Sequence, residues 1–329
     1  MSLYLMLALG FILLLAGGEL LVRGSVSLAE RLGMSPLLIG VVLVGFGTSM
    51  PEMVTSVEAS LAGSPGIAVG NIVGSNLANT LLVLGLSALI VPIAISPIVA
   101  SRDGIFVLAS TLAFVAIGYV LSLDRMVGAA LLIGLAFYIW ITYRQEKLSF
   151  ANDAAAKKKS ESKDFDGKAL SSEVAALAVR SQTALPIGMT LVGLALLIIG
   201  GKILVDGARG IALEAGVSET IIGLTIVAVG TSLPEMVTCV IAAIRRHGDV
   251  ALGNVMGSNI YNLLAIGGVT AVISPTVIPP EIVRFDNLVL LAATITLVVL
   301  LRVSKKVGRI QGALLLAGYV AYIAVLWPA

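Results

Sequence analysis

Apolar residues fill long runs of this chain, and short polar or turn-forming segments separate those runs. A helix of about 20 apolar residues crosses the ~30 Å hydrocarbon core of a bilayer. Ten runs come close to this length or exceed it, over residues 3–28, 36–61, 67–91, 102–122, 125–145, 184–208, 219–244, 250–273, 285–303 and 308–327. The pattern therefore predicts an all-α membrane protein with ten transmembrane helices.

The composition agrees with a chain that lies mostly in lipid. Hydrophobic residues make up 58% and charged residues 12% of the sequence, and the mean hydropathy is +1.06. Because a soluble domain carries about 25% charged residues, the composition excludes a soluble fold. We expect contact with the lipid bilayer and none with nucleic acid.

One polar segment divides the apolar pattern. Residues 146–183 contain Lys157, Lys158 and Lys159 among scattered acidic residues. We interpret this segment as a flexible cytoplasmic linker. It joins five predicted spans in residues 1–145 to five in residues 184–329.

Two motifs occur twice, and the same offset along the chain separates the copies of each. The sequence GTSMPE at Gly47–Glu52 returns as GTSLPE at Gly230–Glu235, and GNIVGSNLAN at Gly70–Asn79 returns as GNVMGSNIYN at Gly253–Asn262. Of the 46 aligned positions around these motifs, 21 are identical without a gap. The two five-span halves are therefore repeats of each other, and we call two residues related by this offset counterparts.

The basic residues predict how the halves are oriented. With the N-terminus outside, 17 Lys and Arg fall on the cytoplasmic side and four on the outer side, or nine against four without the eight in residues 144–180. This bias favours an outer N-terminus and an outer C-terminus. Because an odd number of spans separates the repeats, they enter the membrane in opposite directions. We therefore predict two inverted-topology five-helix repeats.

Glu52 and Glu235 lie near the middles of two predicted spans. A carboxylate at that depth costs roughly 2.5–3.5 kcal/mol, so each needs a partner. A buried ion pair is one alternative, but Arg23 and Lys202 lie toward span ends, where long side chains reach the interface. The remaining partners are a proton and a metal cation.

Oxygen-bearing residues accompany both glutamates. Hydroxyl residues precede each glutamate by four and three positions and so share its helix face. In the next span of each half, a serine and an asparagine four residues apart also share a face. These residues are Thr48, Ser49, Ser75 and Asn79 in the first half and Thr231, Ser232, Ser258 and Asn262 in the second. Because calcium binds six to eight such oxygens and sodium uses the same groups, we predict a cation site.

Four more asparagines lie in the second motif, at Asn71, Asn76, Asn254 and Asn259. They could be further ligands. We favour hydrogen bonds to the backbone or between helices for all four.

The chain has one cysteine, Cys239, and one histidine, His247. A single cysteine forms no disulfide within the chain, and this pair is too few for a usual zinc site. We find no Ser–His or His–metal arrangement that would support catalysis. We therefore expect no enzyme activity and no cofactor.

The paired GTSxPE and GNxxGSNxxN motifs resemble the alpha repeats of the calcium/cation antiporter superfamily. The ten-span layout is similar to that of its prokaryotic sodium/calcium exchanger branch. The resemblance implies that both glutamates and the eight oxygen-bearing residues line one central cavity, with calcium and sodium as the transported ions. It also implies that carbonyl groups near Gly45 and Ala228 join the sodium ligands. A prokaryotic plasma (inner) membrane is the implied location.

Some members of this family carry Asp in one half at the position of Asn79 or Asn262. This chain has Asn at both positions, so its site holds two carboxylates instead of three. The resemblance further implies that the first and sixth spans slide against the others. The pairs Gly17–Gly18 and Gly200–Gly201 would either permit that sliding or serve only in helix packing.

Exchange follows from the charge of the site. Two close carboxylates repel each other unless one divalent cation, or two or more monovalent cations, neutralise them. If only the filled site can change its access, one ion species is traded for another. We expect a sodium/calcium antiporter that exports calcium from the cytoplasm, driven by the sodium gradient. The alternatives are an exchanger of protons for calcium or another divalent cation at the same glutamates, and a cation channel, which the antiparallel duplication disfavours.

Overall fold

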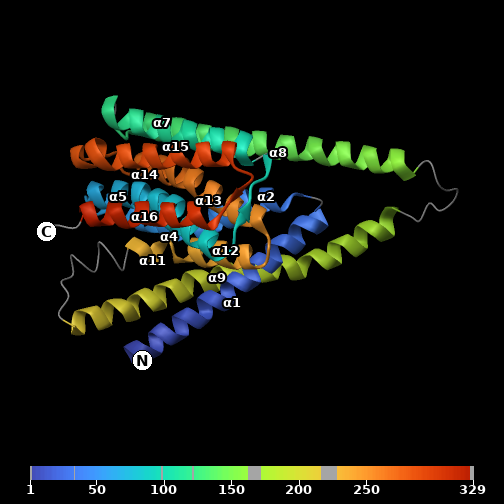
Figure 1. Ribbon diagram of the computed structural model, residues 1–329, viewed down its shortest axis with the longest axis horizontal. Helices are drawn as coiled ribbons and strands as arrows, with labels where there is room; N and C mark the ends of the chain where they lie inside the picture. The colour runs from blue at the N-terminus through green and yellow to red at the C-terminus, as the bar shows by residue number, and fades with distance from the viewer. Residues whose placement is uncertain are drawn as a thin grey trace.

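The computed structural model describes residues 2–32, 34–97, 99–120, 122–161, 172–215 and 228–326. Helices dominate this part of the chain and lie roughly side by side (Figure 1). The α-helices are α1 Leu3–Leu32, α2 Pro36–Ile39, α3 Phe46–Thr48, α4 Met50–Leu61, α5 Pro65–Leu77, α6 Leu84–Ile90, α7 Gly104–Val120, α8 Arg125–Glu161, α9 Ser172–Glu214, α11 Ala228–Thr231, α12 Leu233–Ile244, α13 Gly248–Ile260, α14 Gly267–Ile273, α15 Asn287–Val303 and α16 Arg309–Leu326. The π-helical segments are η1 Gly40–Gly45, η2 Ala78–Val83, η3 Val99–Asp103, η5 Tyr261–Ile266 and η6 Ile282–Asp286, and the strands are β1 Ile93–Ala94 and β2 Lys306–Val307.

Within the described residues, eight helices are long and apolar enough to cross a membrane. The helical segments Leu37–Thr48 and Met50–Leu61 meet at a bend of 41° and together make a ninth. These spans confirm an all-helical integral membrane protein. The predicted span over residues 219–244 is described only from Ala228 onward, where it contains α11 and α12.

The predicted linker is partly helical. Helix α8 continues through Glu161, and α9 begins at Ser172, so both helices extend into residues 146–183. Residues 162–171 lie outside the described part of the chain. Helical structure therefore extends further into residues 146–183 than the polar composition predicted.

Helices α1 and α9 pack closely along their lengths (Figure 1). Glycines make this approach possible because a Cβ atom at Gly17 would lie 2.8 Å from the Gly193 carbonyl oxygen, and one at Gly200 would lie 2.9 Å from the Leu14 nitrogen. No side chain fits between backbones at such distances. Gly17 and Gly200 therefore serve in packing, whereas a Cβ atom at Gly18 would meet α12 and one at Gly201 would come no closer than 4.0 Å to Leu14 of α1.

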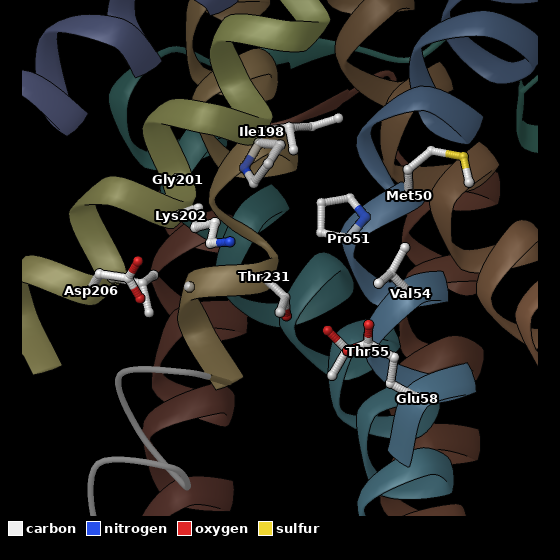
Figure 2. A pocket seen from close by; sticks show the side chains of 13 residues that line it. Met50, Pro51, Val54, Thr55, Glu58, Ile198, Gly201, Lys202, Asp206 and Thr231 are labelled. Atoms are coloured by element: carbon white, nitrogen blue, oxygen red, sulfur yellow. The ribbon is translucent and has the colours of Figure 1, made fainter. Parts of the chain in front are cut away.

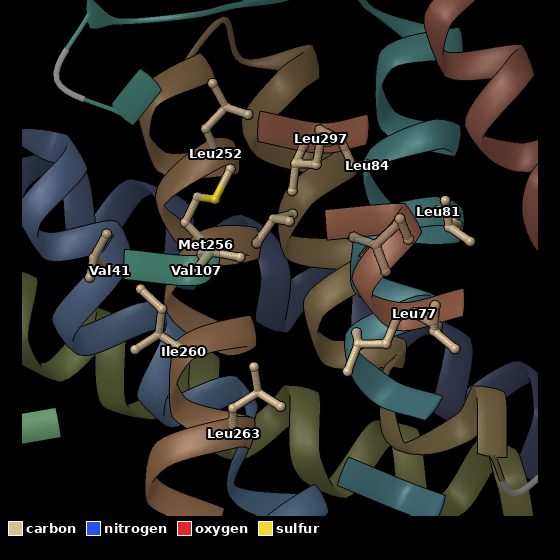
Figure 3. Packing of buried hydrophobic residues seen from close by; sticks show 14 of the residues in the cluster. Val41, Leu77, Leu81, Leu84, Val107, Leu252, Met256, Ile260, Leu263 and Leu297 are labelled. Atoms are coloured by element: carbon tan, nitrogen blue, oxygen red, sulfur yellow. The ribbon is translucent and has the colours of Figure 1, made fainter. Parts of the chain in front are cut away.

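The spans that carry the second motif form the centre of the bundle. In the most apolar stretch of each span, 78% of the residues are buried in Pro65–Ile90 and 83% in Gly248–Ile273, against 17% in Arg309–Leu326. Apolar side chains such as Leu77, Leu84 and Met256 fill the space around them (Figure 3). Each motif therefore lies where lipid does not reach.

Backbone pairing at the two ends of the bundle follows the repeat. Strand β1 pairs with β2 so that Lys306 lies opposite Ala94, and Ala94 lies beside Gly248 at the start of α13. Leu123, the counterpart of Lys306, pairs with Thr276 at the other end of α7. There the hydroxyl groups of Ser274 and Ser60 each donate a hydrogen bond to the backbone carbonyl of the other residue, near the turn between α4 and α5. We call these ends the α12–α13 end and the α4–α5 end.

The two turns themselves have the same conformation. Gly63 has a φ of 73°, and its counterpart Arg246 has a φ of 62°. The Gly63 nitrogen donates to the Ser60 carbonyl at 3.0 Å, and the Arg246 nitrogen donates to the Ala243 carbonyl at 3.0 Å. Both helices therefore end in a left-handed residue, a conformation that glycine adopts easily and arginine does not.

Candidate ion-binding site

Two broken helices bring the motif glutamates to the centre of the bundle. Ser49 precedes α4 with a ψ of 6°, and Ser232 precedes α12 with a ψ of 7°. A proline occupies the first turn of each helix, where its missing N–H group interrupts no helical hydrogen bond. The residue that follows each proline is the glutamate, so both carboxylates lie at helix N-termini, which favour negative charge.

Glu52 and Glu235 are fully buried, at 0% exposure, and their hydrogen bonds cross between the halves. The Ser49 hydroxyl donates to Oε1 of Glu235 at 3.0 Å. The Ser232 hydroxyl donates to Oε1 of Glu52 at 3.3 Å. Each carboxylate is therefore held by the serine of the other half, and the two predicted motifs meet in one site.

The second oxygen of each carboxylate has no hydrogen-bond partner. Oε2 of Glu52 and Oε2 of Glu235 are buried, and no donor among the described residues reaches either atom. A buried carboxylate oxygen without a partner carries a large desolvation cost. A cation bound between the two glutamates would offset that cost.

Asn71 and Asn254 hold the backbone of the broken helices. The Asn71 side-chain amide donates to the Glu52 carbonyl at 3.0 Å and to the Ser56 hydroxyl at 2.9 Å. The Asn254 amide donates to the Glu235 carbonyl at 3.3 Å. These hydrogen bonds agree with the prediction that these asparagines join helices and backbone.

The other two asparagines also make such bonds. The Asn76 amide donates to the Ile72 carbonyl at 2.7 Å. The Asn259 amide donates to the Thr80 hydroxyl at 2.9 Å, across the halves. Thr80 is a contact that the motifs did not predict, because its counterpart is a leucine, Leu263.

Asn79 and Asn262 differ from these four asparagines. Both are 0% exposed, and neither amide atom of either residue has a hydrogen-bond partner among the described residues. Each is the second residue of a π-helical segment, η2 or η5, a helix type that often occurs at functional sites. Their amide oxygens are therefore available as neutral ligands, and that role stays a prediction.

Thr48, Ser258 and Gly45 form a second set of contacts. The Thr48 hydroxyl lies 3.0 Å from the Val44 carbonyl and 3.1 Å from Oδ1 of Asn254. The Ser258 hydroxyl lies 3.3 Å from the Gly45 carbonyl and 3.4 Å from Oε1 of Glu235. The Gly45 carbonyl thus lies beside the site, and the Ser258 hydroxyl contacts both this carbonyl and Glu235.

The structure places the remaining predicted residues less closely. Ser75 is buried on α5, one turn before Asn79. Thr231 ends α11 and lines a cavity beside the site. Ala228 begins α11 directly after residues outside the described part, so the role of its carbonyl stays a prediction.

The site is a set of oxygens with a formal charge of −2 when both glutamates are ionised. Within the described residues there is no group of three or more His, Cys, Asp and Glu side chains that could hold a metal. Two carboxylates with hydroxyl, amide and carbonyl oxygens are hard ligands suited to calcium or sodium, and poorly suited to zinc or copper.

A cavity of about 490 Å³ opens beside the site at the α4–α5 end. Helices α4 and α9 form two of its walls, and Figure 2 shows Val54, Thr55 and Glu58 on one wall and Lys202 and Asp206 on the other. Gly230, Thr231 and Pro234, which belong to the second glutamate motif, also line the cavity. The cavity therefore leads from the motif residues toward this end of the bundle.

The sequence reasoning missed the two acidic residues of these walls. Glu58 and Asp206 lie near the ends of predicted spans, a position that usually marks contact with the interface. A buried cluster also escaped it, in which Asp103 accepts hydrogen bonds from Arg102 at 2.8 Å and from Tyr138 at 3.0 Å. Adjacent opposite charges at the start of an apolar run were the available signal.

Comparison with known proteins identifies the family. The sequence pattern of the family described as sodium/calcium exchanger protein matches residues 2–144 and 185–327. The chain belongs to the sodium/calcium exchanger family. The two matched segments are related by the same offset as the motifs, since residues 2 and 144 have their counterparts at 185 and 327.

Relatives of this exchanger family member cover nearly the whole chain. Sodium/calcium exchanger MaX1 of Methanosarcina acetivorans is 31% identical over 98% of this chain and 98% of its own length. Inner membrane protein YrbG of Escherichia coli is 33% identical over 98% of this chain and 96% of its own length. The solved sodium/calcium exchanger of Methanococcus jannaschii is 31% identical, with a TM-score of 0.81 over 97% of this chain and 96% of that one. Exchangers are transporters, so this exchanger family member is a transporter and not an enzyme.

Proposed function

We propose that this protein exchanges sodium for calcium by alternating access and exports calcium from the cytoplasm, driven by the sodium gradient. The observation that carries the proposal is the crossed pair of hydrogen bonds, Ser49 to Glu235 and Ser232 to Glu52. It joins two carboxylates in one buried site and leaves an oxygen of each without a partner among the described residues. Membership of the sodium/calcium exchanger family supports these two ions as the cargo.

Ten spans in two inverted repeats are part of this proposal. The pairing of β1 with β2 at the α12–α13 end and of Leu123 with Thr276 at the α4–α5 end supports it. Corresponding segments pair at the two ends with the halves exchanged, shifted by one residue in register, as expected if an approximate two-fold axis in the membrane plane relates the halves. With the N-terminus outside, the α4–α5 end faces the exterior and the α12–α13 end faces the cytoplasm.

The charge of the site sets the exchange. Calcium neutralises both glutamates, whereas sodium must bind at least twice to do so. An empty site leaves two buried carboxylates uncompensated, which is costly in a low-dielectric interior. The site therefore changes its access from one side of the membrane to the other in its filled form. Each such change moves the bound ions across the membrane in one direction.

Flux into reconstituted vesicles tests the function. Proteoliposomes loaded with sodium and diluted into sodium-free buffer should take up radioactive calcium, and vesicles with a pH gradient but no sodium should not. Glu52→Gln should remove the uptake, whereas Glu30→Gln, at the exposed end of α1, should retain it. Absence of uptake by folded wild-type protein under both gradients would refute calcium exchange.

The neutral pair Asn79 and Asn262 favours one second candidate. With two carboxylates only, two protons could replace calcium, which gives a proton/calcium exchanger at the same site. Uptake driven by the pH gradient alone would establish this candidate over sodium exchange.

A further inference from the structure

The α12–α13 end of the molecule is closed by contacts between α1 and α12. A Cβ atom at Gly18 would lie 2.6 Å from Cδ1 of Ile241 and 2.8 Å from Cγ1 of Val237. Beside this contact, the Glu19 carboxylate accepts hydrogen bonds from Nε of Arg245 at 3.1 Å and from Nη2 of the same arginine. Glu19 also pairs with Arg23 on its own helix. An apolar contact and a bidentate ion pair therefore hold α1 against the end of α12.

The repeat places a corresponding set of residues at the α4–α5 end. The counterparts of Gly18 and Glu19 are Gly201 and Lys202 on α9, and the counterparts of Val237 and Ile241 are Val54 and Glu58 on α4. At this end the helices stand apart, and these side chains line the 490 Å³ cavity (Figure 2). A Cβ atom at Gly201 would meet only Leu14 Cδ2, at 4.0 Å, within the described residues. Equivalent helix faces are thus closed at one end and open at the other.

Opposite charges face each other across the open end. Lys202 lies on the α9 wall and Glu58 on the α4 wall (Figure 2). Neither residue forms an ion pair within the part of the chain that the structure describes. Relative to the closed end the signs are reversed, since there the acid is on α1 and the base is on α12.

We propose that Lys202 and Glu58 form an ion pair when α9 closes on α4, and that this pair and Glu19–Arg245 form in alternation. Each pair stabilises the closed form of one end of the molecule, and we call the two pairs latches. In the present conformation Glu19–Arg245 is made and Lys202–Glu58 is open. Closing the cavity would bring Gly201 against Val54 and Glu58, as Gly18 now lies against Val237 and Ile241. This inference rests on the alternating access proposed above and assigns to named residues the control of which end is open.

The strength of such pairs suits this role. Both side chains of the Glu19–Arg245 pair are partly exposed, at 29% and 46%, and exposed ion pairs contribute little each. A latch of this kind biases an equilibrium without preventing the change of conformation. The removal of one latch should therefore shift the two populations by about twofold to fivefold.

Thiol labelling at Thr238 tests the proposal. Thr238 is fully buried, but its counterpart Thr55 lines the open cavity, so a cysteine at position 238 should react only when the α12–α13 end opens. The reporter is Thr238→Cys in a Cys239→Ser background, labelled in detergent solution with a small thiol reagent. Glu19→Gln and Arg245→Gln should raise its labelling rate about twofold to fivefold, and Lys202→Gln and Glu58→Gln should lower it by a similar factor.

Matched variants separate the latches from general effects of charge. Arg31→Gln, at the exposed end of α1, and Asp206→Asn, one turn after Lys202 in the same cavity wall, should leave the rate unchanged. The double variant Lys202→Glu with Glu58→Lys should restore the wild-type rate. Equal labelling of all variants would overturn the proposal, and so would a labelling rate that falls in Asp206→Asn and stays unchanged in Glu58→Gln.

The same samples keep the two proposals apart. Calcium uptake in sodium-loaded vesicles reports the exchange function, whereas labelling reports the balance of conformations whatever the ion. Exchange by the wild type together with equal labelling of the variants refutes the latches alone. If the labelling rates shift as expected but the wild type takes up no calcium, only the proposal that sodium and calcium are the exchanged ions is refuted.

Discussion

Thr111 Oγ1 lies 3.3 Å from Thr294 Oγ1, and the two residues are counterparts in the repeat. Each threonine is thus hydrogen-bonded to its own equivalent in the other half, at the contact between α7 and α15. Two equivalent residues meet in this way only close to a two-fold axis that relates their surroundings. The proposed axis between the halves therefore passes between these two helices.

The two glutamates should both be essential. Glu52→Gln and Glu235→Gln keep the size of the side chain but remove the charge that binds the cation, so each should lower sodium-dependent calcium uptake to the level of empty vesicles. Glu30→Gln is the matched control. Uptake near the wild-type rate in either site variant would show that the site does not need both carboxylates.

The crossed hydrogen bonds should make the two serines equivalent. Ser49→Ala removes the donor to Glu235 and Ser232→Ala removes the donor to Glu52. A hydrogen bond to a charged group contributes about 1.5–3 kcal/mol, so each variant should weaken calcium binding about tenfold to a hundredfold. Calcium dependence of the uptake rate measures this loss. A large effect at one serine and none at the other would contradict the symmetric site.

Asn79 should lower the stability of the ion-free protein and contribute to ion binding. Its amide, unpartnered among the described residues, destabilises the ion-free protein, so Asn79→Leu, which has a similar shape, should raise the ion-free melting temperature and reduce the further increase on adding calcium. Asn71→Leu is the contrast, because it removes two hydrogen bonds and should lower the ion-free melting temperature. Thermal unfolding in detergent, with and without calcium, measures both. A lower ion-free melting temperature for Asn79→Leu would argue against a ligand role.

The glycines between α1 and α9 should not accept side chains. A Cβ atom at Gly193 would lie 2.8 Å from the Gly17 carbonyl oxygen, whereas one at Gly188 would meet no neighbouring element of the described chain within 4 Å. Gly193→Leu should therefore reduce the yield of folded protein severely, and Gly188→Leu, earlier on α9, should not. Size-exclusion chromatography of the two variants compares them. Equal yields would mean that the helices can separate at no cost.

Replacement of Arg246 by glycine should stabilise the protein. Its φ of 62° is a conformation that costs a residue with a side chain roughly 1–2 kcal/mol, and the corresponding turn already has Gly63. Arg246→Gly should raise the melting temperature, whereas Gly63→Ala should lower it. Opposite signs in one unfolding assay are the expected result. A decrease for both variants would show that the arginine side chain outweighs its backbone strain.

The sequence predicted much of the site because the duplication shows the same residues twice. Glu52, Glu235 and their serines were predicted as one site, but helix spacing cannot tell that each serine faces the glutamate of the other half. The π-helical segments that begin at Ala78 and Tyr261 have no distinctive composition, so the sequence did not indicate them. The cavity walls escaped because Glu58 and Lys202 are ordinary interfacial residues until the packing of α4 and α9 is known.

The crossed contacts of Ser49 and Ser232 have a consequence for the origin of the chain. Because each carboxylate accepts a hydrogen bond from the serine of the other half, one half by itself lacks a contact that its glutamate makes in the whole site. If the halves have the inverted orientation proposed above, an ancestor of half this length would have completed this site as a pair of antiparallel chains, inserted in both directions in one membrane. By the same reasoning, residues 1–145 and 184–329 produced as two separate polypeptides should rebuild the site when they meet in one bilayer.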